Sequence, residues 1–335
     1  MQIVTKVIVP ATAVLSSGQD PYDLVALPIV KDDIGVSDTG TDLFLLRSIS
    51  RASSEIAKFC SRTFQVETVL DRIYPARDTV PYSVLAPQRV PDLALSRSPI
   101  ASAPCTAGLA APVAPMLASV VSGALAAARY YVEVTYVTAA GETAVSTESA
   151  LSVGANAVLQ VASPAANVLA TGWNVYVASA SGAETRQNAA PIAIGTPWTQ
   201  PNSGLIAGAA PPSCVAVVEN AVPLAEGIDF LVKYDFGQLV RLDTNARPRL
   251  WPSLPIAAQY QAGFATIPFD VQEGASLLVK RSYYARGRDP MLRQENVVGV
   301  YEASWWLGAG PSSATGNMPP DVSAMIEKYR APVIA

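Results

Sequence analysis

The sequence predicts an α+β protein in which a helical body with a small antiparallel sheet is interrupted by an all-β sandwich. Apolar residues spaced by three and four occur toward both ends of the chain, and short alternating runs lie between them. Charge divides the chain further, because residues 105–213 hold 6 of its 50 charged residues and the other 226 residues hold 44. We therefore expect one body from residues 1–104 and 214–335, with residues 105–213 as an insert.

The N-terminal part of the body is expected to contain two helices. Over residues 41–62 the apolar positions step by three and four. Asp42 at the front of this segment and Arg62 at its rear suit the dipole of a helix. A shorter helix is expected over residues 28–34, where Gly35 ends it.

Residues 1–10 are expected to form an extended arm. Pro10 ends the apolar run after Lys6 well before the length of a signal peptide is reached. Residues 64–71 alternate between apolar and polar side chains, which predicts a strand with one covered face. No run reaches about 18 apolar residues, so the sequence predicts no membrane span.

The insert has the pattern of a small β-sandwich. Residues 130–137 alternate and are followed by the turn Ala140-Gly141-Glu142, which predicts a β-hairpin. Further runs at residues 158–161 and 173–177 are separated by Pro and Gly turns, and short strands at this spacing are typical of a sandwich. Trp173 is expected to anchor the core, because a sandwich of about 100 residues needs a large ring inside.

The C-terminal part of the body is expected to combine strands and helices. Residues 215–260 read as an antiparallel meander with a turn at Asp235-Phe236-Gly237. A long helix is predicted over residues 271–286, and a last helix over residues 321–329 after Pro319-Pro320.

Composition excludes most enzyme mechanisms. The chain has no histidine, which removes the usual base of serine and cysteine nucleophiles and the nitrogen ligand of most zinc sites. Acidic pairs such as Asp32 and Asp33 are expected to be solvated, and the sequence has no Gly-rich phosphate loop. We therefore predict a protein that is not an enzyme and holds no cofactor or metal.

The cysteines and the net charge argue against a secreted disulfide-rich protein and against a protein that binds the DNA backbone. Cys60, Cys105 and Cys214 are odd in number and widely spaced, which favours buried thiols in a reducing cytosol over a disulfide framework. Cys105 and Cys214 bracket the insert, and a disulfide between them stays the less favoured alternative. The formal charge of −4 argues against a protein that grips DNA along its backbone.

Basic and aromatic residues near the C-terminal end predict contacts with a neighbouring chain. Arg286 and Arg288 lie at the end of the long predicted helix, where positive charge is favourable without any ligand. Trp305 and Trp306 are adjacent, so both cannot face one small core. One of them is expected to fill a pocket on a neighbouring subunit.

Several segments, taken in order, resemble the head-to-tail connector (adaptor) proteins of tailed phages. They lie on both sides of the insert: Ile56–Cys60 with Arg62–Phe64, Ser98–Ile100, Tyr260–Phe264, Ile267–Val271, Pro319–Val322 and Tyr329–Pro332. The insert resembles a fibronectin type III or immunoglobulin-like domain, through Arg129–Val132, Ala140–Thr143 and Gly172–Val177. The plain adaptor pattern lacks such a domain.

The resemblance implies a homo-oligomeric ring, usually of twelve subunits, beneath the portal in the neck of the virion. Each subunit of such a ring offers one face to the next. The implied partners are further copies of the chain, the portal protein and the next tail or neck protein. DNA would pass through the channel without sequence-specific binding, no membrane would be involved, and assembly would take place in the host cytoplasm.

The resemblance also implies roles for particular residues. The C-terminal segment would dock on the portal through Met325, Ile326, Tyr329, Arg330 and Ile334. The hairpin at Asp235, Phe236 and Gly237 would face the channel or the next tail component. The insert would point outward, where it does not disturb ring closure.

A second interpretation is a virion decoration or host-surface binding module, in which the sandwich recognises a ligand and the rest anchors it. The insert shows no loop dense in aromatic and polar residues of the kind that binds sugars. The sequence therefore favours the connector. Subunit number, portal contacts, the role of the insert and the host stay open.

Overall fold

The computed structural model describes residues 2–12, 14–74, 92–252, 254–286, 294–297, 301–304 and 318–331. Its internal contacts divide the chain into two compact units. The sheet unit comprises Met1–Pro10 with Glu67–Ala262, and the helical unit comprises Ala11–Val66 with Gly263–Ala335. The expected boundaries after residues 104 and 213 stay a prediction.

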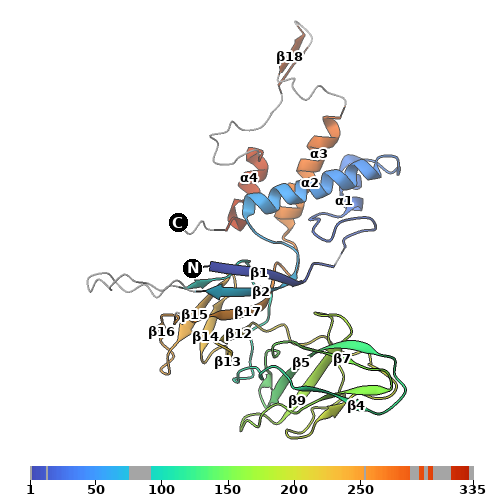
Figure 1. Ribbon diagram of the computed structural model, residues 1–335. Coiled ribbons are helices and arrows are strands. Elements are labelled where there is room, and N and C mark those ends of the chain that lie inside the picture. The colour runs from blue at the N-terminus through green and yellow to red at the C-terminus, as the bar shows by residue number, and fades with distance from the viewer. Residues whose placement is uncertain are drawn as a thin grey trace, which may run out of the picture. The chain divides into compact units, whose positions relative to one another are not determined.

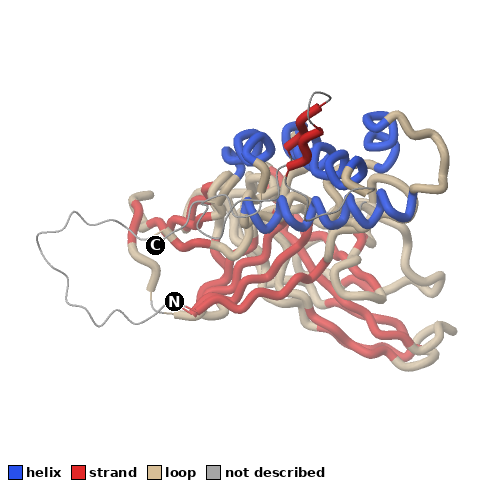
Figure 2. The backbone as a smooth tube through the Cα atoms, turned by 90° about the horizontal axis from the view of Figure 1, so that it is seen from above, coloured by secondary structure: helices blue, strands red, loops and turns tan. Residues whose placement is uncertain are grey.

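The helical unit contains four α-helices in its described residues (Figure 1). They are α1 (Leu27–Ile34), α2 (Asp42–Cys60), α3 (Phe269–Tyr284) and α4 (Pro320–Ile326), which the 3-10 turn η1 (Glu327–Tyr329) continues. Each of the four helices expected from the sequence is confirmed, with small shifts at the ends. Figure 2 shows these helices in blue as one group. Two short strands of this unit, β18 (Gln294–Val297) and β19 (Tyr301–Ser304), pair with each other.

Local sequence explains where the helices begin and end. Gly35 ends α1 in the left-handed conformation, at a φ of 75°, and its N–H donates to the carbonyl of Asp32. Asp42 lies in the first turn of α2 and Lys58 in the last turn, where each charge complements the helix dipole. Pro320 occupies the first turn of α4, a position where the missing N–H of proline costs no helical hydrogen bond.

One hydrophobic cluster holds the helical unit together, and α3 contacts both α2 and α4 within it. Its fully buried residues include Leu45, Ile49 and Ile56 of α2, Val271, Ala275 and Val279 of α3, and Val322 and Ile326 of α4. On each helix these positions are spaced by four or seven residues, so one face of the helix supplies them.

The sheet unit begins with a five-stranded antiparallel sheet in the order β1–β2–β17–β12–β13. Its strands are β1 (Gln2–Val9), β2 (Glu67–Tyr74), β17 (Ile256–Ala262), β12 (Ala216–Glu219) and β13 (Val222–Leu224). The N-terminal residues, expected from the sequence to be an extended arm, form a paired edge strand with Gln2 opposite Tyr74.

A second, smaller sheet packs against the first. It consists of β3 (Leu93–Ala94), β14 (Phe230–Lys233), β15 (Gln238–Leu242) and β16 (Pro248–Arg249). A single buried cluster includes residues of both sheets, among them Val69, Phe230, Leu239, Ile256 and Tyr260. Burial of apolar side chains between two sheets is what stabilises this part of the chain.

Between β3 and β12 the chain forms a β-sandwich, which we define as residues 117–199. One sheet contains β4 (Leu117–Val121), β8 (Ala157–Val161) and β11 (Trp198–Thr199). The other contains β5 (Ala128–Thr138), β6 (Gly141–Glu142), β7 (Ser149–Val153), β9 (Gly172–Ala178) and β10 (Thr185–Arg186). Residues of both sheets enclose one core, and Trp173 is fully buried in it, as predicted.

The predicted α+β fold with a helical body is wrong. The protein is mostly β, with 30% strand against 19% helix, and it has several sheets. The helices carry strong local signals, whereas many of the strands are only two to five residues long. The pairing of β2 with β17 joins Val69 to Tyr260, and no local pattern reveals a partner that far along the chain.

A buried carboxylate ties together the parts of the sheet unit that precede and follow the sandwich. Asp71 of β2 is completely buried and accepts hydrogen bonds from the hydroxyl of Tyr260 at 2.7 Å and from the amide and hydroxyl of Ser96 at 2.7 and 2.6 Å. The amide of Arg97 in turn donates to the hydroxyl of Tyr260 at 3.1 Å. Burial and the nearby Asp71 charge raise the pKa of Tyr260, so its hydroxyl stays protonated and acts as a donor.

The helical core can be tested with two leucines on one helix. Leu45 of α2 is fully buried and Leu43 is 63% exposed. Leu45→Ala is expected to lower the free energy of unfolding by about 2–5 kcal/mol, because it leaves a cavity. Leu43→Ala is expected to change it by less than about 0.5 kcal/mol. Urea unfolding measures both, and equal losses would contradict the described orientation of α2.

The carboxylate network can be tested with a matched pair of tyrosines. Tyr260→Phe removes the hydroxyl that bonds Asp71, and we expect the free energy of unfolding to fall by about 1–3 kcal/mol. Tyr74→Phe, at a 44% exposed tyrosine of β2, is the control and is expected to change little. Urea unfolding again provides the measurement, and a Tyr260→Phe protein as stable as the parent would show that the network is dispensable.

Candidate functional site

The described residues contain no group of three or more His, Cys, Asp or Glu side chains able to hold a metal ion. Within that same part of the chain, every helix is too short or too polar to cross a membrane. In the sheet unit, polar side chains gather in a pocket of about 500 Å³ beside the sandwich.

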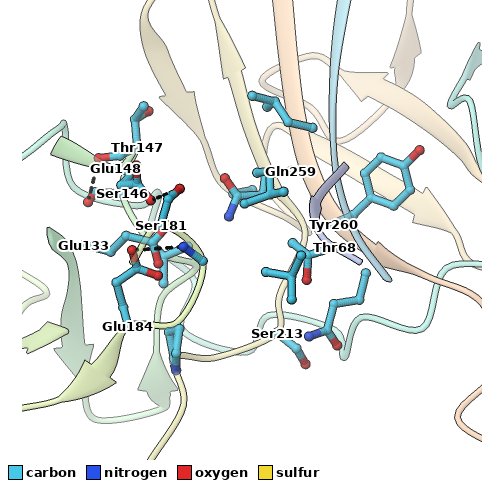
Figure 3. A pocket seen from close by; sticks show the side chains of 18 of the residues that line it. Thr68, Glu133, Ser146, Thr147, Glu148, Ser181, Glu184, Ser213, Gln259 and Tyr260 are labelled. Atoms are coloured by element: carbon cyan, nitrogen blue, oxygen red, sulfur yellow. Dashed lines mark hydrogen bonds between the residues drawn. The ribbon is translucent and has the colours of Figure 1, made fainter. Parts of the chain in front are cut away.

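The pocket lies between the sandwich and the five-stranded sheet (Figure 3). Strands β1, β2, β12 and β17 supply one wall, which includes Lys6, Arg72 and Gln259. The opposite wall comes from β5, from the loop at residues 145–148 and from residues 181–185. Residues 210–214, which lead from the sandwich into β12, complete the lining.

Three glutamates of the sandwich lie close together on one wall of the pocket, as Figure 3 shows. Glu133 of β5 and Glu184 are 5% and 4% exposed. Burial, reinforced by the charge of Glu184, raises the pKa of Glu133 to about 8. Burial and the nearby Glu148 also raise the pKa of Glu184, to about 7. Glu133 therefore keeps its proton at pH 7, whereas Glu184 is about half protonated there.

The two walls interact through the polar side chain of Gln259 and through a close packing contact. The side chain of Gln259, on β17, lowers the pKa of Glu133 and so opposes the effect of burial on that carboxyl. Gly182 has a φ of 78°, and a Cβ atom there would lie 2.6 Å from Cγ2 of Val9. Only a glycine permits this approach of the sandwich loop to β1.

The hydroxyls that line the pocket are engaged in hydrogen bonds of the fold. Ser146 accepts from the amide of Val134 at 3.0 Å and donates to the carbonyl of Thr147 at 3.2 Å. Ser181 donates to Glu148 at 2.7 Å. These bonds join the sandwich loops to one another, and the packing of Gly182 on Val9 places them against the sheet, so the pocket serves as a joint within the sheet unit.

The C-terminal residues implied in portal docking belong to the helical unit. Ile326 is completely buried in the helical core, and Met325 packs against the same core. Tyr329 makes edge contacts with Phe64 and Phe264, at centroid distances of 6.3 and 5.9 Å. Arg330 is exposed, lies over the ring of Phe59 and pairs with Glu327. Ile334 lies outside the described residues. The docking role stays a prediction, and the buried Ile326 side chain contributes to the core.

The residues predicted for subunit contact are described only in part. Arg286 is exposed, and its guanidinium lies 4.5 Å from the centroid of the Phe44 ring. Arg288, Trp305 and Trp306 lie outside the described residues. The role in subunit contact stays a prediction for all four.

The predicted hairpin connects β14 to β15 in the sheet unit. Phe236 at its tip is 58% exposed, and Asp235 is also exposed. Gly237 is buried at a φ of 63°, where a Cβ atom would lie 2.7 Å from the carbonyl oxygen of Arg97. The glycine therefore lets the turn close against residue 97 while Phe236 faces solvent.

Sequence reasoning missed the acidic wall of the pocket. Glu133 alternates with Val132 and Val134, which face the sandwich core, so the pattern places Glu133 on the outer, solvated face. Glu133 is instead buried, on the wall of the pocket that faces the five-stranded sheet. The only local signal for these buried acids is that the sandwich contains few charged residues, so each glutamate in it is unusual.

Comparison with known proteins adds one distant likeness. No protein-family model matches the chain, and no curated protein matches it significantly. A solved structure described as the neck of an empty GTA particle computed with C6 symmetry is 12% identical, and the comparison covers 100% of this chain and 98% of that chain. The TM-score is 0.37, and both values are too low to assign a fold or a function.

The protonated Glu133 predicts a pH-dependent stability. Folded Glu133 keeps its proton to about pH 8, whereas an unfolded glutamate releases it near 4.5. Between these values the folded state binds more protons, so the free energy of unfolding falls as pH rises, by up to about 1.4 kcal/mol per pH unit. Glu133→Gln removes this proton exchange, and we expect a shallower slope between pH 5 and pH 8 in urea unfolding.

Glu184 contributes a slope of the same sign, so part of the pH dependence is expected to remain in Glu133→Gln. Glu55→Gln is the matched control, because the Glu55 side chain is 43% exposed on α2. It should retain the parental slope. A Glu133→Gln protein with the parental slope would show that Glu133 is ionised in the folded state at neutral pH.

Proposed function

We propose that this chain is a structural protein of a phage-like virion, a head-to-tail connector that assembles with copies of itself into a ring in the neck. The supporting observation is that the segments that resemble connector proteins, although far apart in the sequence, contact one another within each unit of the fold. A chance collection of short similarities has no reason to converge in this way.

In the sheet unit, the segments at residues 98–100 and 260–262 converge. Ile100 forms an isolated antiparallel bridge with Ala262. The amide of Ala101 donates to the carbonyl of Gln261 at 2.8 Å, and the amide of Gln261 donates to the hydroxyl of Ser102. The chain before the sandwich is thus bonded to the strand that follows it.

In the helical unit, three further segments converge. The rings of Phe64 and Phe264 stack at a centroid distance of 5.5 Å, and Tyr329 packs edge-on against both. The amide of Ala331 donates to the carbonyl of Cys60 at 2.8 Å. The end of α2, the start of the segment before α3 and the C-terminal segment therefore form one cluster.

A ring requires that each subunit offer an apolar face to its neighbour. The helical unit exposes large side chains that its own core does not cover: Leu43 is 63%, Tyr284 69% and Phe269 76% exposed. We propose that these residues, together with Arg286, contribute to the contact between subunits. The subunit number of twelve, docking on the portal and passage of DNA through the ring belong to the same proposal, and none of these roles requires a catalysed reaction.

Mixing the purified chain with the portal protein of the same particle tests the proposal. We expect a closed ring with a mass of about 420 kDa, as twelve chains of 35.1 kDa would give, in mass photometry and in electron micrographs. Only monomer in that mixture would overturn the connector proposal, since the function requires the ring.

Two phenylalanines provide matched variants for this experiment. Phe269→Ala removes an exposed ring of the helical unit, and we expect it to weaken ring formation. Phe236→Ala removes a 58% exposed ring at the hairpin tip, and it should leave the ring intact and weaken binding of the next tail component. Equal melting temperatures would show that both variants fold, and rings unaffected by Phe269→Ala would exclude this ring contact.

A further inference from the structure

The three cysteines differ in their surroundings. Cys60 is completely buried in the core of the helical unit. Cys105 and Cys214 are half-buried in the sheet unit, and all three are free thiols. Cys214 also lines the pocket described above.

The backbone brings the two half-buried cysteines together. On the incoming side of the sandwich, the amides of Ala101 and Ser102 both donate to the carbonyl of Gln261. On the outgoing side, Ala216 pairs with Gln259 of the same strand, β17. Both segments therefore leave β17 within a few residues of each other, and the thiols of Cys105 and Cys214 lie close enough for each to shift the pKa of the other.

Further contacts hold Cys105 in place. Its amide donates to Oε2 of Glu226 at 3.0 Å, and its thiol contacts the carbonyl of Glu142 at 3.7 Å. Tyr234 donates to the other oxygen of Glu226 at 2.5 Å. The position of Cys105 is thus determined by the strand end, by the carboxylate and by the sandwich turn at Glu142.

The interaction between the two thiols makes their pKa values unequal. It lowers the pKa of Cys105 to about 7 and raises that of Cys214. Burial raises the pKa of Cys60 to about 11. A thiolate is the attacking species in thiol–disulfide exchange, so Cys105 is the nucleophile of the pair and Cys60 is inert at neutral pH.

We propose that Cys105 and Cys214 form a redox site, at which a small-molecule disulfide of the glutathione class converts the two thiols into a disulfide that staples the two ends of residues 105–214. The site does not depend on the proposed function. The bond would restrict the unfolded chain over a long loop, so oxidation is expected to raise the melting temperature.

The exchange balances in two steps. The Cys105 thiolate attacks one sulfur of glutathione disulfide, forms a mixed disulfide and expels one glutathione thiolate. Cys214 then loses its proton to water and attacks Sγ of Cys105, which expels the second glutathione thiolate. Two protein thiols are oxidised to one disulfide, and one glutathione disulfide is reduced to two glutathione molecules.

The experiment uses the full chain, first reduced and then freed of reductant without oxygen. After incubation with glutathione disulfide near neutral pH, free thiols are counted in denaturant. We expect the count to fall from three to one, the intact mass to fall by that of two hydrogens, and a proteolytic digest to contain one peptide pair cross-linked through Cys105 and Cys214. The oxidised protein should melt at a higher temperature than the reduced protein.

Single variants separate the roles of the two thiols. Cys214→Ala should stop at a glutathione adduct on Cys105 and react about tenfold more slowly at pH 7, because the pKa of Cys105 returns toward its ordinary value. Cys60→Ala is the matched control and should form the same cross-link as the parent. Three free thiols after incubation, a persistent glutathione adduct on the parent protein, or a cross-link that includes Cys60 would each overturn the proposal, and an unchanged melting temperature would overturn the staple.

Discussion

The buried carboxylate of Asp71 is the interaction on which the sheet unit depends. A charged group with no exposed surface is stable only when its oxygens are bonded, and here Ser96 and Tyr260 supply the donors. Asp71 and Ser96 precede the sandwich in the sequence, and Tyr260 follows it. The network therefore specifies how the two halves of an interrupted sheet fit together, which apolar burial between the sheets does not specify by itself.

This arrangement explains how a segment as long as the sandwich is accommodated within one sheet unit. The incoming and outgoing segments both pair with β17, so the sandwich leaves and re-enters the sheet at neighbouring points. The joint also includes the interaction of Gln259 with Glu133, the packing of Gly182 on Val9 and the thiols of Cys105 and Cys214. Protons stabilise the acidic wall of this joint, and an oxidant is proposed to act on its thiols.

The proposed role in a virion neck suits a chain in which buried polar side chains, such as Asp71, bond distant segments of the same chain to one another. The helical unit and the sheet unit each bury their own core, and both expose large apolar side chains at their surfaces, such as Phe269 and Phe236. A structural protein that tiles with copies of itself needs such rings at subunit contacts. In this view the pocket beside the sandwich is an internal joint, and binding to other proteins is carried by exposed rings elsewhere.

The sequence by itself determined the four helices, the burial of Trp173 and the exclusion of histidine-based chemistry, because each depends on composition or on residues within a few turns of one another. The predictions from sequence were wrong where paired strands or packed faces lie far apart in the chain. The pairing of β1 with β2 and of β2 with β17 made the protein mostly β, and the covered face of β5 turned Glu133 from an expected surface charge into a buried acid. The sequence leaves a Cys105–Cys214 disulfide as the less favoured alternative, and the structure brings both cysteine segments to β17. Only the tertiary structure decides such features. Burial between distant segments selects which strands pair, and the local sequence pattern of a strand does not identify its partner.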